Sequence, residues 1–193
     1  MTADDGDQPD LLSDLSDLDF VRHLLADLND DLRGKVARFR MLTDLGRDMG
    51  RHGTMIFGGH APYHAWIEAR SSFVHGNFVA TVLLCQGLVE HLLAAYLHGG
   101  LMVDDLPERI AFRVTLSRCR ERGVISEQDD TDLKRLMALR NPLSHFRHIY
   151  DVTSLAHRSL DSSKIAKDLV RRDAIFAISL AMRILAKPAF RLG

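Results

Sequence analysis

The stretch that decides the fold is His75–Gly100, HGNFVATVLLCQGLVEHLLAAYLHGG. Its apolar side chains fall on nearly every side of a helix. They include Phe78, Val82, Leu84, Cys85, Leu88, Val89, Leu92 and Tyr96. A helix that is apolar on most sides is buried at the centre of a protein or crosses a membrane. Because Gln86, Glu90 and His91 interrupt the apolar run, we expect a central core helix and no membrane span.

Helices are also predicted on both sides of this central stretch. Upstream, Pro62 fits the first turn of a helix over residues 61–74, because proline is tolerated where the backbone N–H has no helical partner. Downstream, the segment that opens at Asp105-Leu-Pro107 and closes at Gly123 is typical of another helix. Proline and glycine therefore mark one helix before the central stretch and one after it.

Two further helices complete the expected bundle. Ser126, followed directly by acidic residues, is a strong N-cap for a helix that runs to about Arg140. After a loop near 148–160, Asp161 or Ser162 starts a last helix. Because no segment alternates apolar and polar residues as a strand does, the predicted fold class is all-α. We expect an up-and-down bundle of five to six helices.

The N-terminal third divides into three segments. Residues 1–15 are acidic and predict a flexible tail. Residues 16–45 predict one amphipathic helix, with apolar positions three and four apart at Leu18, Val21, Leu25, Leu28, Leu32, Val36, Phe39 and Leu42. This near-heptad spacing fits packing on a partner chain and packing on the chain's own domain equally well. Residues 46–60 hold five glycines and predict a loop, which leaves 61–193 as the main helical domain.

The composition is that of an ordinary globular protein. Of the 193 residues, 46% are hydrophobic and 26% are charged, and the formal net charge is −1. No large cationic excess draws nucleic acid to the whole surface, so any RNA contact must use a local patch. The N-terminal residues lack the basic and apolar regions of a signal peptide, and both cysteines fall within helical patterns. We therefore expect a cytoplasmic protein.

The segment 140-RNPLSH-145 carries the candidate chemistry. The residue before a proline avoids helical geometry, so we expect the helix to end near Arg140. Asn141 would then cap a new short helix that starts at Pro142, and the free N–H groups there would favour an anion. On one straight helix Arg140 and His145 would lie about 140° apart, whereas a break allows them to converge.

An arginine, a histidine and helix-terminal N–H groups suffice for RNA cleavage without a metal. The imidazole of His145 can move protons, and the planar guanidinium of Arg140 can bind a phosphate and stabilise negative charge. The competing interpretation is structural, since helix ends often carry such residues for capping alone. His60 and His64 have zinc-like spacing, but they lack a third ligand nearby, so no metal site and no cofactor are expected.

The motif and the upstream helix together resemble the HEPN domain superfamily. Many of its members carry an arginine, a polar residue directly after it and a histidine four to six residues beyond the arginine, here Arg140, Asn141 and His145. The upstream GNF and the acidic Glu90 resemble the helix that precedes this motif in the family. The order of the predicted helices also fits, over roughly 60–187.

This resemblance implies an all-α domain, with a short helix after the motif, that forms a homodimer and brings two motifs into one cleft. Active members are metal-independent endoribonucleases, often toxins of toxin–antitoxin systems, and they leave 2′,3′-cyclic phosphate ends. Carried over, His145 transfers the proton, Arg140 clamps the phosphate and Asn141 positions or caps. RNA, a second copy and an antitoxin protein are the implied partners.

Other motif residues are given supporting roles. Glu90 is expected to pair with Arg140 and orient it, and Ser144 is a second supporting residue. Arg147 and His148 extend a cationic rim for RNA, unless they are ordinary solvated residues.

The residue two positions after His145 differs from the pattern of one branch of the superfamily. One branch of the superfamily has a tyrosine two residues after the histidine, but this chain has Arg147 there and its nearest tyrosine is Tyr150. That departure puts in doubt the pairing with a nucleotidyltransferase antitoxin found in this branch.

Two other interpretations of the chain remain open. A non-catalytic HEPN-like module that binds a nucleotide, RNA or a protein is the first alternative. A helical protein that dimerises through its N-terminal helix is the second.

Overall fold

The computed structural model describes residues 18–99, 107 and 109–192. These residues are helical with no strand among them, which confirms the predicted all-α class; Thr54 and Arg191 form an isolated β-bridge. The helices in chain order are α1 (Leu18–Asn29), α2 (Leu32–Gly46), the 3₁₀ helix η1 (Arg47–Met49), α3 (His60–His75), α4 (Phe78–Gly99), α5 (Phe112–Glu121), α6 (Glu127–Ser144), α7 (Leu155–Ser162) and α8 (Ala166–Leu185). The acidic segment 1–15 lies outside the described residues.

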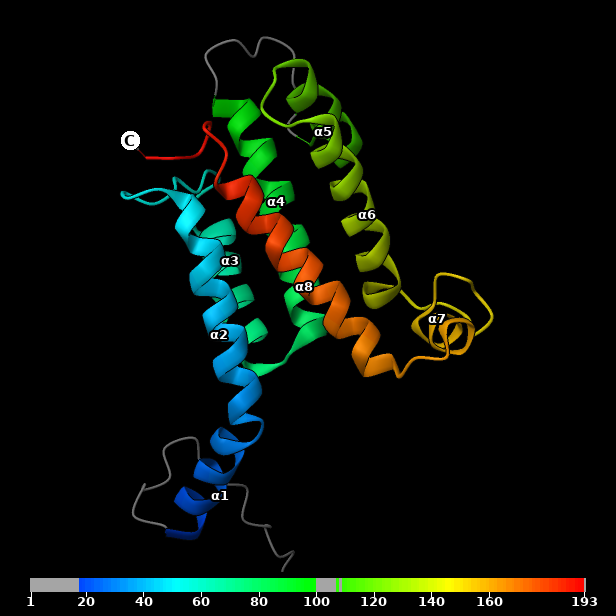
Figure 1. The fold of residues 1–193 in the computed structure, drawn as a ribbon. Helices are drawn as coiled ribbons and strands as arrows, with labels where there is room; N and C mark the ends of the chain where they lie inside the picture. Colours follow the sequence, from blue (N-terminus) through cyan, green and yellow to red (C-terminus); the bar gives the residue numbers. More distant parts are fainter. Residues whose placement is uncertain (1–17, 100–106, 108, 193) are drawn as a thin grey trace, which may run out of the picture.

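Helix α4 is the centre of the molecule, as its sequence predicts. It packs against α3, α5, α6 and α8, and it runs between them in Figure 1. Leu88, Val89, Leu92 and Leu93 are fully buried. Of the described helices, α4 is the one with the length and composition to cross a membrane, and half of its most apolar window is buried within the bundle. Its apolar surface is largely used by packing inside the chain.

The single helix expected over 16–45 is two helices. They are separated at Asp30 and Asp31, and Asp31 adopts a left-handed conformation with φ 50°. The Asp31 carboxylate accepts a hydrogen bond from Arg38 at 2.9 Å. It also lies so close to Gly34 that a Cβ there would be 2.3 Å from Asp31 Oδ1. Glycine at position 34 therefore leaves room for the Asp31 carboxylate beside the first turn of α2.

The helices after α4 differ from the prediction at their ends. Helix α5 begins at Phe112, and the expected opening at Asp105 lies outside the described residues. The loop expected over 148–160 contains the start of α7, capped by the Ser154 hydroxyl, which accepts from His157 N at 3.0 Å. The last helix, α8, begins at Ala166, after α7 has ended. Eight α-helices in the described ranges thus replace the expected five to six.

Buried ion pairs connect the later helices. The buried Asp173 on α8 accepts two hydrogen bonds from Arg158 on α7, at 2.8 and 3.0 Å. At the other end of α8, Lys187 lies 2.5 Å from Asp129, the third residue of α6. Asp129 also completes the capping box with Ser126 that starts α6. These contacts hold α6 and α7 on α8 and so fix the position of the segment between them.

Candidate functional site

Helix α6 continues through the motif, so the predicted break at Asn141 is wrong. The helix ends at Ser144, with Pro142 inside its last turn, and Asn141 caps no new helix. Proline removes one N–H, and the carbonyl that loses this partner belongs to the exposed Ala138. The Ser144 hydroxyl lies 3.3 Å from the carbonyl oxygens of Arg140 and Asn141 and can donate a hydrogen bond to either one. The expected anion site at a new helix N-terminus is therefore not formed.

Arg140 and His145 nevertheless come together within one chain. His145 follows the helix with extended geometry, φ −127° and ψ 139°, so its ring is not bound to the helical spacing. Arg140 Nη1 lies 3.4 Å from His145 Nε2. Because a guanidinium can only donate, this contact is a hydrogen bond in the tautomer in which His145 Nε2 is the accepting nitrogen. The pair therefore combines a proton acceptor with a cation.

This pair lies beside a surface hollow. Arg140 is half-buried and His145 is exposed. The hollow has a volume of about 410 Å³ and is lined by Pro142, Leu143, Ser144, His145, Phe146, Arg147, Ile149, Ser154, Leu155 and Ala156. Phe146 is 90% exposed, although it is one of the largest apolar side chains. Sequence reasoning missed Phe146, but the alternation of aromatic and basic residues in 145-HFRHIY-150 was a usable indication.

The predicted rim residues have local partners. Arg147 Nε lies 3.9 Å from an Asp151 oxygen, so its charge is partly balanced. The Thr153 hydroxyl and N–H both donate to Asp151 and hold the pKa of its carboxyl below the usual value, with help from Arg147. His148 accepts from Tyr150 N at 3.4 Å, and the two rings lie 5.1 Å apart. The rim is cationic but interrupted by one carboxylate.

Glu90 does not pair with Arg140. Its carboxylate accepts a hydrogen bond of 2.5 Å from Gln86, one turn earlier on α4. Within the described ranges no ion pair joins Glu90 to Arg140, so the expected orienting role of Glu90 is wrong. A polar partner on the same helix face satisfies the carboxylate locally. The contact that positions the Arg140 guanidinium is instead the one with His145.

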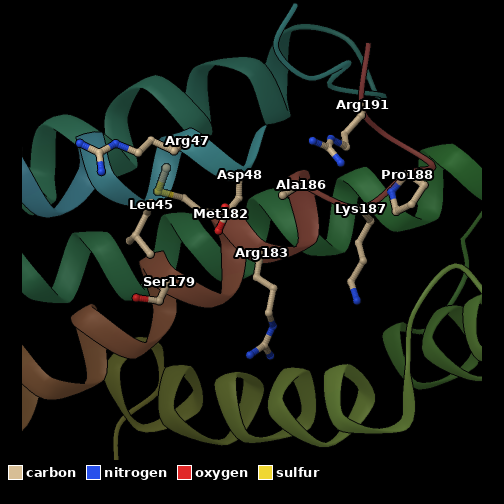
Figure 2. A pocket seen from close by; sticks show the side chains of 10 residues that line it. All are labelled: Leu45, Arg47, Asp48, Ser179, Met182, Arg183, Ala186, Lys187, Pro188 and Arg191. Carbon is tan, nitrogen blue, oxygen red and sulfur yellow. The ribbon is translucent and has the colours of Figure 1, made fainter. Parts of the chain in front are cut away.

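A larger hollow, of about 620 Å³, lies far along α8 from the motif. Figure 2 shows its lining, which is Leu45, Arg47, Asp48, Ser179, Met182, Arg183, Ala186, Lys187, Pro188 and Arg191. Arg183 and Lys187 point toward α6, where Arg183 pairs with Asp129 and Asp132, and Lys187 pairs with Asp129. Two of its cations are therefore occupied by structural ion pairs, and the hollow contains none of the predicted site residues.

Metal ligands and known relatives give no indication of what the site around Arg140 and His145 does. In the part of the chain that the structure describes, no three His, Cys, Asp or Glu side chains are grouped to hold a metal ion. No protein-family model, no curated protein and no solved structure matches the chain. The contact between Arg140 and His145 beside the hollow is therefore the feature from which a function can be inferred.

Proposed function

We propose that the chain is a metal-independent endoribonuclease of the HEPN type that uses Arg140, Asn141 and His145. The observation that carries the proposal is the 3.4 Å contact between Arg140 Nη1 and His145 Nε2 beside an open hollow. An arginine with a purely structural role would be expected to pair with a buried carboxylate. Arg140 instead contacts the imidazole of His145, a group that can transfer protons. Asn141 contributes its backbone carbonyl, which accepts from His145 N at 3.0 Å and fixes where the histidine leaves the helix.

The chemistry follows from these positions. When RNA binds, Arg140 turns from His145 Nε2 to the phosphate and so frees the lone pair of that nitrogen. The 2′-oxygen of a ribose attacks the adjacent phosphorus, and His145 Nε2 takes the proton of that hydroxyl. Arg140 donates to the non-bridging oxygens as negative charge grows on them. The bond from phosphorus to the 5′-oxygen breaks, and this oxygen takes a proton from a protonated His145 of a second copy. The products are a 2′,3′-cyclic phosphate end and a 5′-hydroxyl end.

The second copy belongs to the same proposal. One histidine cannot both accept the first proton and donate the second within one step, whereas two motifs in one cleft can. Phe146, Ile149, Tyr150 and Val152 are each more than half exposed next to the motif. Such an apolar surface favours contact with a second chain or with an antitoxin protein that covers the site.

The test is incubation of a labelled structured RNA with the protein in excess EDTA. Products that end in cyclic phosphate are expected, and mass analysis of the 3′ ends identifies them. A folded protein that binds RNA but cuts none of several RNAs would overturn the nuclease proposal.

That second outcome would favour a non-catalytic HEPN-like module. One observation supports this candidate: the apolar side chains beside the motif form a surface suited to a protein partner. It predicts that Phe146→Ser weakens partner binding, whereas His145→Ala does not.

A further inference from the structure

Helix α1 lies outside the bundle. Figure 1 shows it beyond the end of α2, extending away from the other helices. All twelve of its residues are described, and none of them is buried. Leu18, Leu24, Leu25 and Leu28 are between 45% and 69% exposed. An isolated helix of this length is only marginally stable in water, so α1 needs a surface to pack on.

Helix α2 also carries exposed apolar side chains after the bend at Asp30 and Asp31. Leu32, Val36 and Phe39 are each at least 42% exposed. A hollow of about 650 Å³ lies over this part of α2 and is lined by Lys35, Val36, Phe39, Arg40, Thr43, Asp44, Arg47 and Val74. The two helices therefore present an apolar face, bent at Asp30 and Asp31, that none of the other described helices buries.

Charge is divided along this face. Of the described residues, 18–31 hold four aspartates and one arginine, with no lysine or glutamate. Residues 32–51 hold six arginines and lysines against two aspartates. Arg40 and Arg47 stand at the α2 hollow, while Asp27 and Asp30 flank the end of α1. The acidic half of the face complements the basic half of the same face on another copy.

We infer that α1 of one copy docks on the outer face of α2 of a second copy, and the reverse. Two such faces packed antiparallel about a two-fold axis place each acidic α1 against a basic α2, and the contact is self-complementary. Parallel packing would set α1 against α1 and bring like charges together. This interface goes beyond the proposed nuclease, because neither the surface nor its test involves the motif.

Cysteine cross-linking tests the arrangement. In the inferred arrangement α1 of one copy lies on α2 of the other, so Leu24 of one copy comes near Arg40 of the other. Two copies of Leu24 then lie on opposite sides of the two-fold axis and apart from each other. The native Cys85 and Cys119 are fully buried, and burial raises the pKa of the Cys119 thiol to about 12, so both are unreactive.

The experiment mixes full-length Leu24→Cys with full-length Arg40→Cys and adds a short thiol cross-linker. The expected product joins one chain of each kind, in excess over either like-with-like product. Cross-links confined to Leu24→Cys pairs, or no cross-link, would overturn the inference.

A mass measurement in solution gives an independent reading. Leu25→Asp places a charge in the apolar stripe and is expected to shift the association midpoint to at least tenfold higher protein concentration. His23→Asp adds the same charge to the polar side of α1 and is the matched control. Because α1 contributes no buried residue among those described, neither change should alter the melting temperature of the bundle. Both variants are measured in a Phe146→Ser background, which weakens any contact between copies through the motif surface. Equal association of the two would contradict the docking site, whatever the RNA assay shows.

Discussion

Arg140 and His145 meet because the helix ends between them. Five residues apart on a continuous helix, their side chains would diverge, but His145 is the first residue outside α6 and its extended backbone returns the ring to the guanidinium. Ser144 occupies the last helical position and bonds backward to carbonyls of the final turn. The motif thus depends on where the helix stops, and the predicted break was unnecessary for the contact.

Substitution of Arg140 separates its charge from its shape. Arg140→Ala should lower RNA cleavage by about 10²–10³-fold, the typical effect of removing a group that stabilises transition-state charge. Arg140→Lys should retain part of the rate, because lysine keeps the charge but lacks the planar fork. Single-turnover rates at saturating protein measure both. Equal rates for the wild type and Arg140→Ala would remove Arg140 from the mechanism.

Asp129 should make stability depend on acid pH. Burial by itself would raise the pKa of Asp129, but the Lys187 ammonium and the Ser126 hydrogen bonds outweigh it and hold the pKa below the usual value. The contribution is therefore complete above the unfolded pKa near 4 and is lost as the pH falls through the lower folded value. Asp129→Asn should reduce the free energy of unfolding by about 1–3 kcal/mol at pH 7.

Urea unfolding at several pH values measures this. The difference between wild type and Asp129→Asn should shrink below pH 4. Asp48→Asn, at an exposed aspartate, is the control and should change little. A difference that stays constant down to pH 2 would contradict the assigned ion pair.

At the scale of the elements, Pro142 is unusual because it lies inside α6, where proline cannot donate a backbone hydrogen bond. The helix tolerates it in its last turn without ending there. Pro142→Ala should restore one backbone donor and raise the free energy of unfolding by about 1–3 kcal/mol. Thermal unfolding followed by circular dichroism measures the change. A clear loss of stability would indicate that proline rigidity, or its packing beside the hollow, outweighs the missing hydrogen bond.

The elements also show which features of the fold could be predicted from the sequence. The α4 pattern and the Ser126 cap predicted their helices closely, because both depend on local periodicity and local hydrogen bonds. The break at Asp30–Asp31 was missed because the apolar stripe runs through it, and because the left-handed backbone of Asp31 and its hydrogen bond to Arg38 are features of the folded chain. Helix α7 was missed because it buries no residue and is held by the Arg158–Asp173 pair, which no single segment reveals.

The site residues also divide into those that the local sequence predicts and those whose contacts depend on how the helices pack. The motif could be found from the order of Arg140, Asn141 and His145, but it lies in the last turn of the Ser126-capped helix and at the residue that follows, where the sequence predicted that the helix had already ended. The partner of Glu90 could not, because the choice between Gln86 and Arg140 depends on how α4 and α6 are rotated against each other. The exposure of Phe146 is equally a property of the folded surface.

The whole molecule is organised around α4, and its stability should show this. Leu88 is fully buried at its centre, so Leu88→Ala should cost about 2–5 kcal/mol through the lost burial and the cavity. Val79 lies on the same helix but is 42% exposed, and Val79→Ala should cost well under that amount. Denaturant unfolding compares the two, and similar losses would contradict the central position of α4.

The Arg140–His145 pair lies at one end of this bundle, and α1 extends from another. The bundle supplies rigidity to the first, because α6 is tied to α8 at its start by the Asp129 ion pairs. The arm, α1, supplies a means of bringing two chains together that does not use the motif surface.

The most direct test is RNA cleavage in excess EDTA by the wild type and by His145→Ala, with His98→Ala, an exposed histidine on α4, as the matched control. The account predicts products with 2′,3′-cyclic phosphate ends from the wild type and from His98→Ala, and none from a folded His145→Ala. Cleavage by His145→Ala at the wild-type rate would show that the Arg140–His145 pair does not carry the activity.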